Sequence, residues 1–358
     1  MDKDNKFFCI EPYISMSITE PGKVFACCLH EGSKITTPDD VWNDPYLKDI
    51  RTKFDRGEIP EECEGCIENE KHSDGRSSRR LDSNKRWLEI HGNYEDYEMS
   101  DAPYRFDFWV GNICNLACPT CTSFYSSTWN SLLQRPGGYP DRNHRNSISP
   151  KEWKPVIEDP PNIDFKNLEW LHFNGGEPLL TDTHFRTLNK IPKEYRKNIR
   201  VEYNTNGTVR VDINNDKWKI LKDFQAVNLT FSIDGIGETF EYVRWPGKWE
   251  TVKDNVDFWV DQAINQDWKN NNWFISFGFN IVKSAYNYDK MDETFEYINN
   301  RWVTPAKRAN PEKFDGYDMV FFCNDHRHMN FTDKDFEDWT KTRDFIREKE
   351  LIDRLRKR

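Results

Sequence analysis

Three cysteines lie within eight residues of the sequence, at Cys114, Cys118 and Cys121, in a C-x3-C-x2-C spacing. A strand-like apolar run over 104–110 precedes them, so we expect them on a loop. Thiolates bind soft metals, but a structural zinc site uses four ligands and an ordinary four-iron cluster is held by four cysteines. A four-iron cluster held by only three thiolates leaves one iron with an open position. The spacing therefore predicts an iron–sulfur loop that binds a small molecule at that iron.

A second group of cysteines lies near the start of the sequence, at Cys9, Cys27, Cys63 and Cys66, and the last two form a C-x2-C knuckle. A segment as short as 1–70 buries little apolar surface, and a metal bound by these thiolates would help it to order. Spacing alone does not separate zinc from an iron–sulfur cluster. Scattered buried cysteines are the alternative, which the knuckle disfavours. Cys28, next to Cys27, is an alternative ligand.

From about residue 103 onward, strand-like and helix-like segments alternate. The expected strands are 105–110, 168–173, 199–203, 227–233, 273–282 and 318–322, and the expected helices are 125–134, 182–190, 216–223, 249–264, 286–300 and 333–355. This alternation predicts an α/β fold with a parallel sheet. Six strand–helix units are too few for an eight-fold barrel, so we expect an open partial (β/α)6 TIM-like barrel. A short strand after Gly22 and a capped helix over 40–51 are expected before it.

Glycine-bearing turns with polar side chains follow the second, third and fourth expected strands. They read Asn174-Gly175-Gly176-Glu177-Pro178, Asn204-Thr205-Asn206-Gly207 and Ser232-Ile233-Asp234-Gly235. Because the carboxyl ends of parallel strands meet at one edge of a sheet, we expect these turns beside the cysteine loop. Glycine lets the backbone approach a ligand closely, and a few polar groups fix the ligand's orientation. One such turn alone would be an ordinary connection, but several beside three thiols predict a binding site.

Composition limits the partners and the location. The 358-residue chain has a formal net charge of −10 and a mean hydropathy of −0.91. This charge argues against broad, sequence-independent binding to nucleic acid. With no apolar run of about 18 residues and no signal segment, we expect a cytoplasmic protein that does not cross a membrane. Its nine cysteines then indicate metal binding or catalysis rather than disulfides.

We divide the sequence into an N-terminal segment over 1–70, a polar linker over 71–102 and a larger domain over 103–358. The basic stretch in the linker is interpreted as a solvated face, and a helix is expected near 85–91. Residues 135–163 form a polar insertion, either a lid over the substrate or a solvated loop. The basic terminus over 354–358 is expected to be a solvated helix end.

In combination, these motifs resemble the radical S-adenosylmethionine (SAM) superfamily over most of the chain. The cysteine loop and the Gly-Gly-Glu-Pro, Thr-Asn-Gly and Ser-Ile-Asp-Gly turns match its pattern in the same order. The spacing of Cys9, Gly22, Cys27, Cys63 and Cys66, with the helix between Val41 and Arg51, is similar to the twitch segment, a short relative of the SPASM domain.

The sequence departs from the superfamily in two places. Twitch segments usually follow the barrel, whereas this one precedes it. Thr120 stands before the last cysteine of the loop, where the superfamily often has an aromatic residue. Phe124 or Tyr125 could stack on the adenine instead.

The resemblance implies an enzyme with two [4Fe–4S] clusters. Cys114, Cys118 and Cys121 would hold the cluster that chelates SAM, and Cys9, Cys27, Cys63 and Cys66 would hold an auxiliary cluster. Reductive cleavage of SAM would give a 5′-deoxyadenosyl radical that removes a hydrogen atom from the substrate. The electron would come from a reductase, a flavodoxin or a ferredoxin.

The resemblance also assigns roles at the strand ends. Glu177, in a turn with Gly175, Gly176 and Pro178, would accept hydrogen bonds from the SAM ammonium. Asn206 and Ser232 are candidates for contacts to the ribose or carboxylate, and Asp234 belongs to the same cofactor-binding turn as Ser232. Arg244 is either a bidentate partner of the SAM carboxylate or a surface arginine.

For the reaction, we expect cross-linking, epimerisation or dehydrogenation of a peptide or protein. The alternatives are a nucleoside, a sugar or another small metabolite as substrate, and, in another class, a non-catalytic electron-transfer or zinc-stabilised protein. Cys323 is interpreted first as a buried strand cysteine, which packs like a small hydrophobe. The alternatives for it are the hydrogen-atom donor of a radical epimerase and a metal site with His326 and His328.

Overall fold

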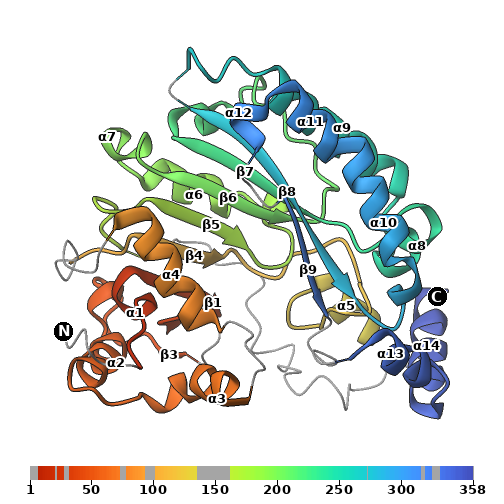
Figure 1. Ribbon diagram of the computed structural model, residues 1–358, viewed down its shortest axis with the longest axis horizontal. Coiled ribbons are helices and arrows are strands. Elements are labelled where there is room, and N and C mark those ends of the chain that lie inside the picture. Colours follow the sequence, from red (N-terminus) through yellow and green to blue (C-terminus); the bar gives the residue numbers. More distant parts are fainter. Residues whose placement is uncertain are drawn as a thin grey trace. The chain divides into compact units, whose positions relative to one another are not determined.

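The computed structural model describes residues 7–20, 22–27, 32–72, 78–92, 101–134, 162–271, 273–315, 319–324 and 331–357. In these ranges it has an α/β fold (Figure 1) with the strands β1 Ser15–Glu20, β2 Lys23–Phe25, β3 Ser33–Lys34, β4 Arg105–Trp109, β5 Trp170–Asn174, β6 Arg200–Thr205, β7 Ala226–Ser232, β8 Phe274–Lys283 and β9 Val320–Asn324. They form a nine-stranded sheet with the order β3-β2-β1-β4-β5-β6-β7-β8-β9. β2 pairs antiparallel with β1 and β3, whereas β1–β4, β6–β7, β7–β8 and β8–β9 are parallel pairs.

The α-helices are α1 Glu11–Ile14, α2 Pro45–Asp55, α3 Glu64–His72, α4 Arg79–His91, α5 Ser127–Leu133, α6 Thr183–Lys190, α7 Lys193–Arg196, α8 Gly237–Val243, α9 Trp249–Asn265, α10 Met291–Ile298, α11 Thr304–Ala309, α12 Pro311–Phe314, α13 Asp333–Thr340 and α14 Arg343–Arg356. Short 3-10 turns are η1 Val41–Asn43, η2 Glu61–Cys63, η3 Pro178–Leu180, η4 Lys219–Asp223 and η5 Tyr288–Lys290, and η6 Asn299–Val303 is a π-helical turn. In the described part of the chain, no helix has both the length and the apolar character needed to cross a membrane.

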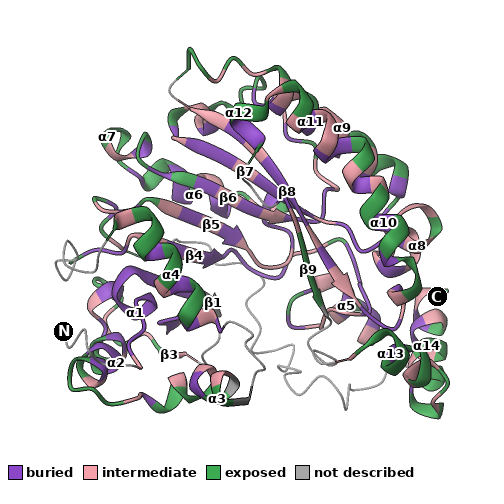
Figure 2. Cartoon of the chain, viewed as in Figure 1, coloured by how far each residue is buried: buried purple, intermediate pink, exposed green. Residues whose placement is uncertain are grey.

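The chain divides into two compact units. The first comprises Met1–Trp109, Ile157–Phe173 and Phe185–Ile199, and the second comprises Val110–Val156, Asn174–His184 and Arg200–Arg358. In the second unit, α9 packs on β8, and its buried Trp259 donates a hydrogen bond to the carbonyl of Ser276 at 2.9 Å. Trp302 stacks on Phe279 of β8 at a centroid distance of 5.1 Å. Figure 2 shows the resulting pattern, with β7 and β8 largely buried and the outer sides of α9 and α10 exposed.

The six strands expected after residue 103 are confirmed as β4 to β9, with small shifts of their ends. The short strand after Gly22 is β2. The sequence did not predict β1, which pairs in parallel with β4. Both faces of β1 are buried, since Ser15, Met16, Ser17 and Ile18 are all at most 3 % exposed. Its sequence, Ser-Met-Ser-Ile-Thr-Glu, alternates polar and apolar residues, and this alternation is the signal that could have identified the strand.

The helices over 125–134, 182–190 and 249–264 are confirmed as α5, α6 and α9, and 40–51 corresponds to η1 and α2. The single helix expected over 333–355 is wrong, because the Thr342 side chain accepts a hydrogen bond from Phe345 N and begins a new helix, α14. The segment 216–223 contains only the 3-10 turn η4, and 286–300 divides into η5, α10 and the start of η6. Residues 73–77 of the basic stretch and 135–161 of the insertion lie outside the described residues. The division at 1–70, 71–102 and 103–358 stays a prediction.

Candidate metal centre

The cysteine loop, residues 111–126, is held by the first turn of the helix that follows it. Ser127 Oγ accepts a hydrogen bond from Cys114 N and donates one to Cys114 O, both at 3.1 Å, and Thr128 Oγ1 donates to the same carbonyl at 2.7 Å. Trp129 Nε1 donates to Cys118 O at 2.7 Å. These bonds explain why the loop is directly followed by α5, because the polar residues that begin the helix satisfy the loop backbone.

The turn after β5 is bonded to the cysteine loop through the backbone. Gly176 N donates to Gly111 O at 2.8 Å, and Glu177 N donates to Ile113 O at 2.7 Å. A Cβ atom at Gly176 would lie 2.5 Å from Ile113 O, so that a side chain at this position would force the two segments apart. Gly175 has a φ of 122°, which also favours glycine. The expected closeness of this turn and the cysteine loop is therefore confirmed.

Glu177 is fully buried, and its carboxylate joins the turn after β5 to the end of β6. Oε1 accepts hydrogen bonds from Thr205 Oγ1 at 2.8 Å and Leu179 N at 3.2 Å, and Oε2 accepts from Asn206 N at 2.6 Å. Burial raises the pKa of Glu177 to about 7, against the opposing effect of these hydrogen bonds and of Arg244. Since a carboxylate accepts about four hydrogen bonds, Oε2 has capacity for a further donor.

The remaining strand-end residues lie in the same unit as the loop. Asn206 Nδ2 donates to Asn115 Oδ1 at 2.9 Å and to Cys114 Sγ at 3.8 Å. Ser232 is half-buried at the end of β7, opposite Asn280 of β8. Pro178 is buried as the first residue of η3. Of these residues, Asn206 makes direct contact with a candidate ligand.

Arg244 is only partly exposed and its side chain is mostly covered, which argues against the surface alternative. Its Nη2 pairs with Asp234 Oδ2 at 2.6 Å, and the two side chains are 12 % and 0 % exposed. Asp234 is fixed in turn, since its Oδ1 accepts from Val282 N at 2.8 Å and its backbone carbonyl accepts from Asn287 Nδ2 at 2.7 Å. Burial would lower the pKa of Arg244, but Asp234 and the nearby Cys118 raise it. The guanidinium is therefore a fixed positive charge beside the cysteine loop.

The three thiols lie close enough to influence one another. Burial raises the pKa of all three, to about 12 for Cys114. Cys118 raises the pKa of Cys114 and Cys121 further, whereas Arg244 lowers the pKa of each thiol. Metal ligation requires thiolates, so a metal that binds here would displace protons.

Thiols of this kind are ligands both for a single soft metal ion and for an iron–sulfur cluster. Within the ranges given above, no group of three or more His, Cys, Asp or Glu residues is arranged to hold a metal ion. Thr122 Oγ1 and Arg244 Nε, next to the thiols in sequence or in space, are buried without a hydrogen-bond partner. Buried polar atoms of this kind are typical of a site that a bound group completes.

The N-terminal cysteines gather in the first unit. Cys9 and Cys27 are buried, and Cys63 and Cys66 are half-buried. Burial raises the pKa of Cys9, and the nearby Glu11, Cys63 and Cys66 raise it further. Cys28 lies outside the described residues, so the choice between Cys27 and Cys28 as a ligand stays open.

Tyr46 is a residue of this region that the sequence did not single out. Burial raises the pKa of Tyr46, and Glu62, Cys63 and Cys27 raise it further. Its hydroxyl is buried without a hydrogen-bond partner. Tyr46 therefore lies near the thiols of Cys27 and Cys63, where its hydroxyl could donate a hydrogen bond to a bound group. No local signal marks it, since it belongs to the expected helix.

The helix α4 anchors the segment that carries Cys9. Arg80 Nη1 and Asn84 Nδ2 each donate to Phe8 O at 2.9 Å. Arg80 also pairs with Glu70 of α3, the helix on which Cys66 lies. The helix expected near 85–91 within the linker is confirmed as the second half of α4, and the Ser78 N-cap, whose side chain accepts from Leu81 N, is the signal that marks its earlier start.

Cys323 is exposed in β9, opposite Val282 of β8, so the preferred expectation of a buried strand cysteine is wrong. Phe321, two residues earlier in the strand and therefore on the same face, is 50 % exposed. β9 is the last strand in the order of the sheet, which leaves its outer edge unpaired within the described residues. His326 and His328 lie outside those residues.

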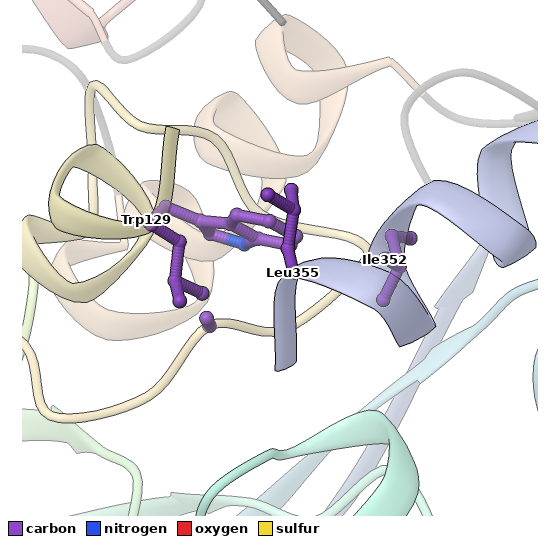
Figure 3. Packing of buried hydrophobic residues seen from close by; sticks show 5 residues of the cluster. Trp129, Ile352 and Leu355 are labelled. Carbon is purple, nitrogen blue, oxygen red and sulfur yellow. The ribbon is translucent and has the colours of Figure 1, made fainter. Parts of the chain in front are cut away.

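The basic terminus is not a solvated helix end. Leu355 is 2 % exposed and packs with Ile352 against Trp129 of α5 (Figure 3). Arg356 Nη2 donates to Ala117 O, in the cysteine loop, at 2.8 Å. Apolar residues at 351, 352 and 355 follow the helical spacing, and this pattern is the signal that could have identified the buried side.

No family model matches the sequence, and no curated protein matches it.

Proposed function

We propose that this chain is a radical SAM enzyme that modifies a peptide or protein. One observation carries the proposal: a loop with three cysteines is bonded to Glu177 and Asn206, which belong to the glycine-bearing turns after β5 and β6. A zinc-stabilised protein or an electron carrier has no need for polar turns around a loop with one thiol too few for a closed site.

In this proposal, Cys114, Cys118 and Cys121 would hold a [4Fe–4S] cluster, which with bound SAM and one electron would supply a 5′-deoxyadenosyl radical and methionine. Glu177 Oε2 accepts a hydrogen bond from the SAM ammonium, as its remaining capacity allows. Asn206 and Ser232 contact the ribose or the carboxylate. Arg244 has its Nη2 engaged by Asp234, which leaves its unpartnered Nε for the SAM carboxylate.

The polar face of the sheet in the second unit supports a peptide as the substrate. Ser276 Oγ donates to Asn228 Oδ1 at 3.0 Å, and Asn228 Nδ2 donates to Thr230 Oγ1 at 2.8 Å, across β7 and β8. Thr230 Oγ1 donates to the Glu202 carboxylate of β6 at 3.1 Å. Neutral amides and hydroxyls beside a carboxylate suit the amide groups of a peptide better than the phosphates of a nucleotide. We propose that these strands form the inner face of a partial (β/α)6 barrel.

Two further groups of residues complete the proposal. Cys323 is exposed on β9, where it could give a hydrogen atom to a substrate radical if the reaction is an epimerisation. Cys9, Cys27, Cys63 and Cys66 hold an auxiliary [4Fe–4S] cluster, and a reductase, flavodoxin or ferredoxin supplies the electrons.

Anaerobic reconstitution tests the proposal. Two clusters correspond to about eight irons per chain, and addition of SAM with dithionite should release 5′-deoxyadenosine. The variant Cys114→Ala/Cys118→Ala/Cys121→Ala should retain about four irons and cleave no SAM. Cys323→Ala is the matched control, because it also removes a thiol but should leave the iron content and SAM cleavage unchanged. Zinc in place of iron, or a loaded wild-type protein that cleaves no SAM, would refute the assignment.

A further inference from the structure

The C-terminal helix α14 packs on the cysteine loop (Figure 3). Ile352 and Leu355 form one apolar cluster with Trp129 and Leu132 of α5 and with Ala117 of the loop, all at most 5 % exposed. Cys121 packs against the same cluster. The cluster therefore joins two helices to the loop segment that lies between the candidate ligands.

Arg356 adds the polar connection. Its Nη2 donates to Ala117 O and its Nη1 donates to Tyr242 O, both at 2.8 Å. The guanidinium carbon lies 5.2 Å from the ring centroid of Tyr242 and 5.5 Å from that of Trp245. Ala117 N donates in turn to Trp245 O at 2.6 Å. The backbone N–H and the carbonyl of Ala117, the residue before Cys118, are therefore both hydrogen-bonded, to Trp245 and to Arg356 respectively.

We propose that Arg356 is a positioning residue for the metal-binding loop, which docks the C-terminal helix on Ala117 and so fixes Cys118 for ligation. A guanidinium suits this role because one planar group can donate to two carbonyls and stack on aromatic rings. Its positive charge also lies beside a loop that becomes negative when its thiolates ligate a metal.

Loop order and helix docking are therefore coupled. A metal cluster on the loop stabilises the docked α14, and the docked helix raises the loop's affinity for the cluster by the same factor. This coupling rests on the proposed function, whereas the positioning of the loop by Arg356 does not depend on it.

Hydrogen exchange of the full-length protein before reconstitution tests the positioning role. Arg356→Gln removes a charged donor to two carbonyls, so we expect amides of residues 114–121 to exchange about tenfold faster. Arg354→Gln is the matched control, because Arg354 lies on the same helix but is exposed. Arg356→Lys keeps the charge without the planar fork and should give an intermediate rate. The proposal would be overturned if the loop amides of Arg356→Gln exchanged at the wild-type rate. If Arg356→Gln does not fold, a wild-type rate in Arg356→Lys would overturn it instead.

Iron content after reconstitution tests the coupling. We expect Arg356→Gln to hold about four irons and Arg354→Gln about eight. In the wild type, loading should slow exchange of the α14 amides, and this slowing should be absent when Cys114, Cys118 and Cys121 are replaced by Ala. Full iron in Arg356→Gln, or equal α14 exchange with and without iron, would overturn the coupling. A wild type that binds no cluster would refute the proposed function, while loop exchange would still decide the role of Arg356.

Discussion

Two buried carboxylates show how neighbouring residues decide the state of an ionisable group. Glu11, in the first unit, would have its pKa raised by burial, but Arg105 at 3.2 Å and Arg79 at 3.1 Å lower it below the usual value. Glu177, in the second unit, has mainly uncharged donors, and burial raises its pKa to about 7. Glu11 is therefore a fixed structural anion, whereas Glu177 is a carboxylate that a cationic ligand would stabilise in its charged form.

His184 gives a prediction at this scale, for the pH dependence of stability. The residue is fully buried with Nδ1 3.0 Å from Tyr203 Oη, and burial, with a contribution from Lys217, lowers its pKa from 6.5 to about 3. Below pH 6.5 the unfolded chain binds a proton at this residue that the folded chain does not bind. The group therefore leaves the free energy of unfolding unchanged above that pH and lowers it as the pH drops towards the folded pKa. The slope is about 1.4 kcal/mol per pH unit.

Urea unfolding of the wild type and of His184→Gln, before reconstitution, checks this prediction. The variant should be less stable at neutral pH because a packed ring is lost. The difference between the two free energies of unfolding should shrink as the pH falls from about 6 to about 4. If the free energies of unfolding of the wild type and of His184→Gln changed in parallel with pH, the prediction would be contradicted.

At the scale of elements, the sequence predicts what depends on neighbouring residues in the chain. The alternation of apolar and polar residues identified β4 to β9, and the glycine motifs located the turns that the structure brings to the cysteine loop. β1 was missed although its sequence, Ser-Met-Ser-Ile-Thr-Glu, alternates polar and apolar residues. Arg356 was missed because its role comes from contacts with Ala117 and Tyr242, more than a hundred residues away. Such contacts depend on how elements pack, which local patterns do not encode.

The turn after β5 yields a prediction about backbone packing. Gly176→Ala would place a Cβ atom 2.5 Å from Ile113 O and 2.6 Å from the carbonyl carbon of Asn112, so the backbone of the cysteine loop must move. Overpacking of this kind costs about 1–3 kcal/mol of the free energy of unfolding. Gly65→Ala is the control, because no atom lies within 4 Å of its added Cβ and the residue belongs to α3. Urea unfolding before reconstitution should show a lower free energy of unfolding for Gly176→Ala but not for Gly65→Ala. Equal stability of the two variants would contradict the close approach of Gly176 to Ile113.

At the scale of the whole molecule, the two groups of thiols belong to different compact units. Cys114, Cys118 and Cys121 are held by residues of the second unit, such as Ser127, Asn206 and Arg356. The segment of Cys9 is held within the first unit by Arg80 and Asn84 of α4. In the described part of the chain, each of these supports belongs to the same unit as the thiols that it holds, so we expect that loading of one group does not require loading of the other.

The last prediction follows from this separation. Cys9→Ser/Cys63→Ser/Cys66→Ser removes most of the N-terminal thiols, and we expect this variant to retain about four irons on the second unit. These irons should still bind SAM, which would appear as a change in the electron paramagnetic resonance signal of the dithionite-reduced protein, because the open iron belongs to the other group. Zinc analysis of the wild type decides the metal of the N-terminal thiols, since a zinc site would leave the iron content of the variant equal to that of the wild type. Loss of all iron from the variant would show that the two groups load together, and the independence inferred from their separate supports would then be wrong.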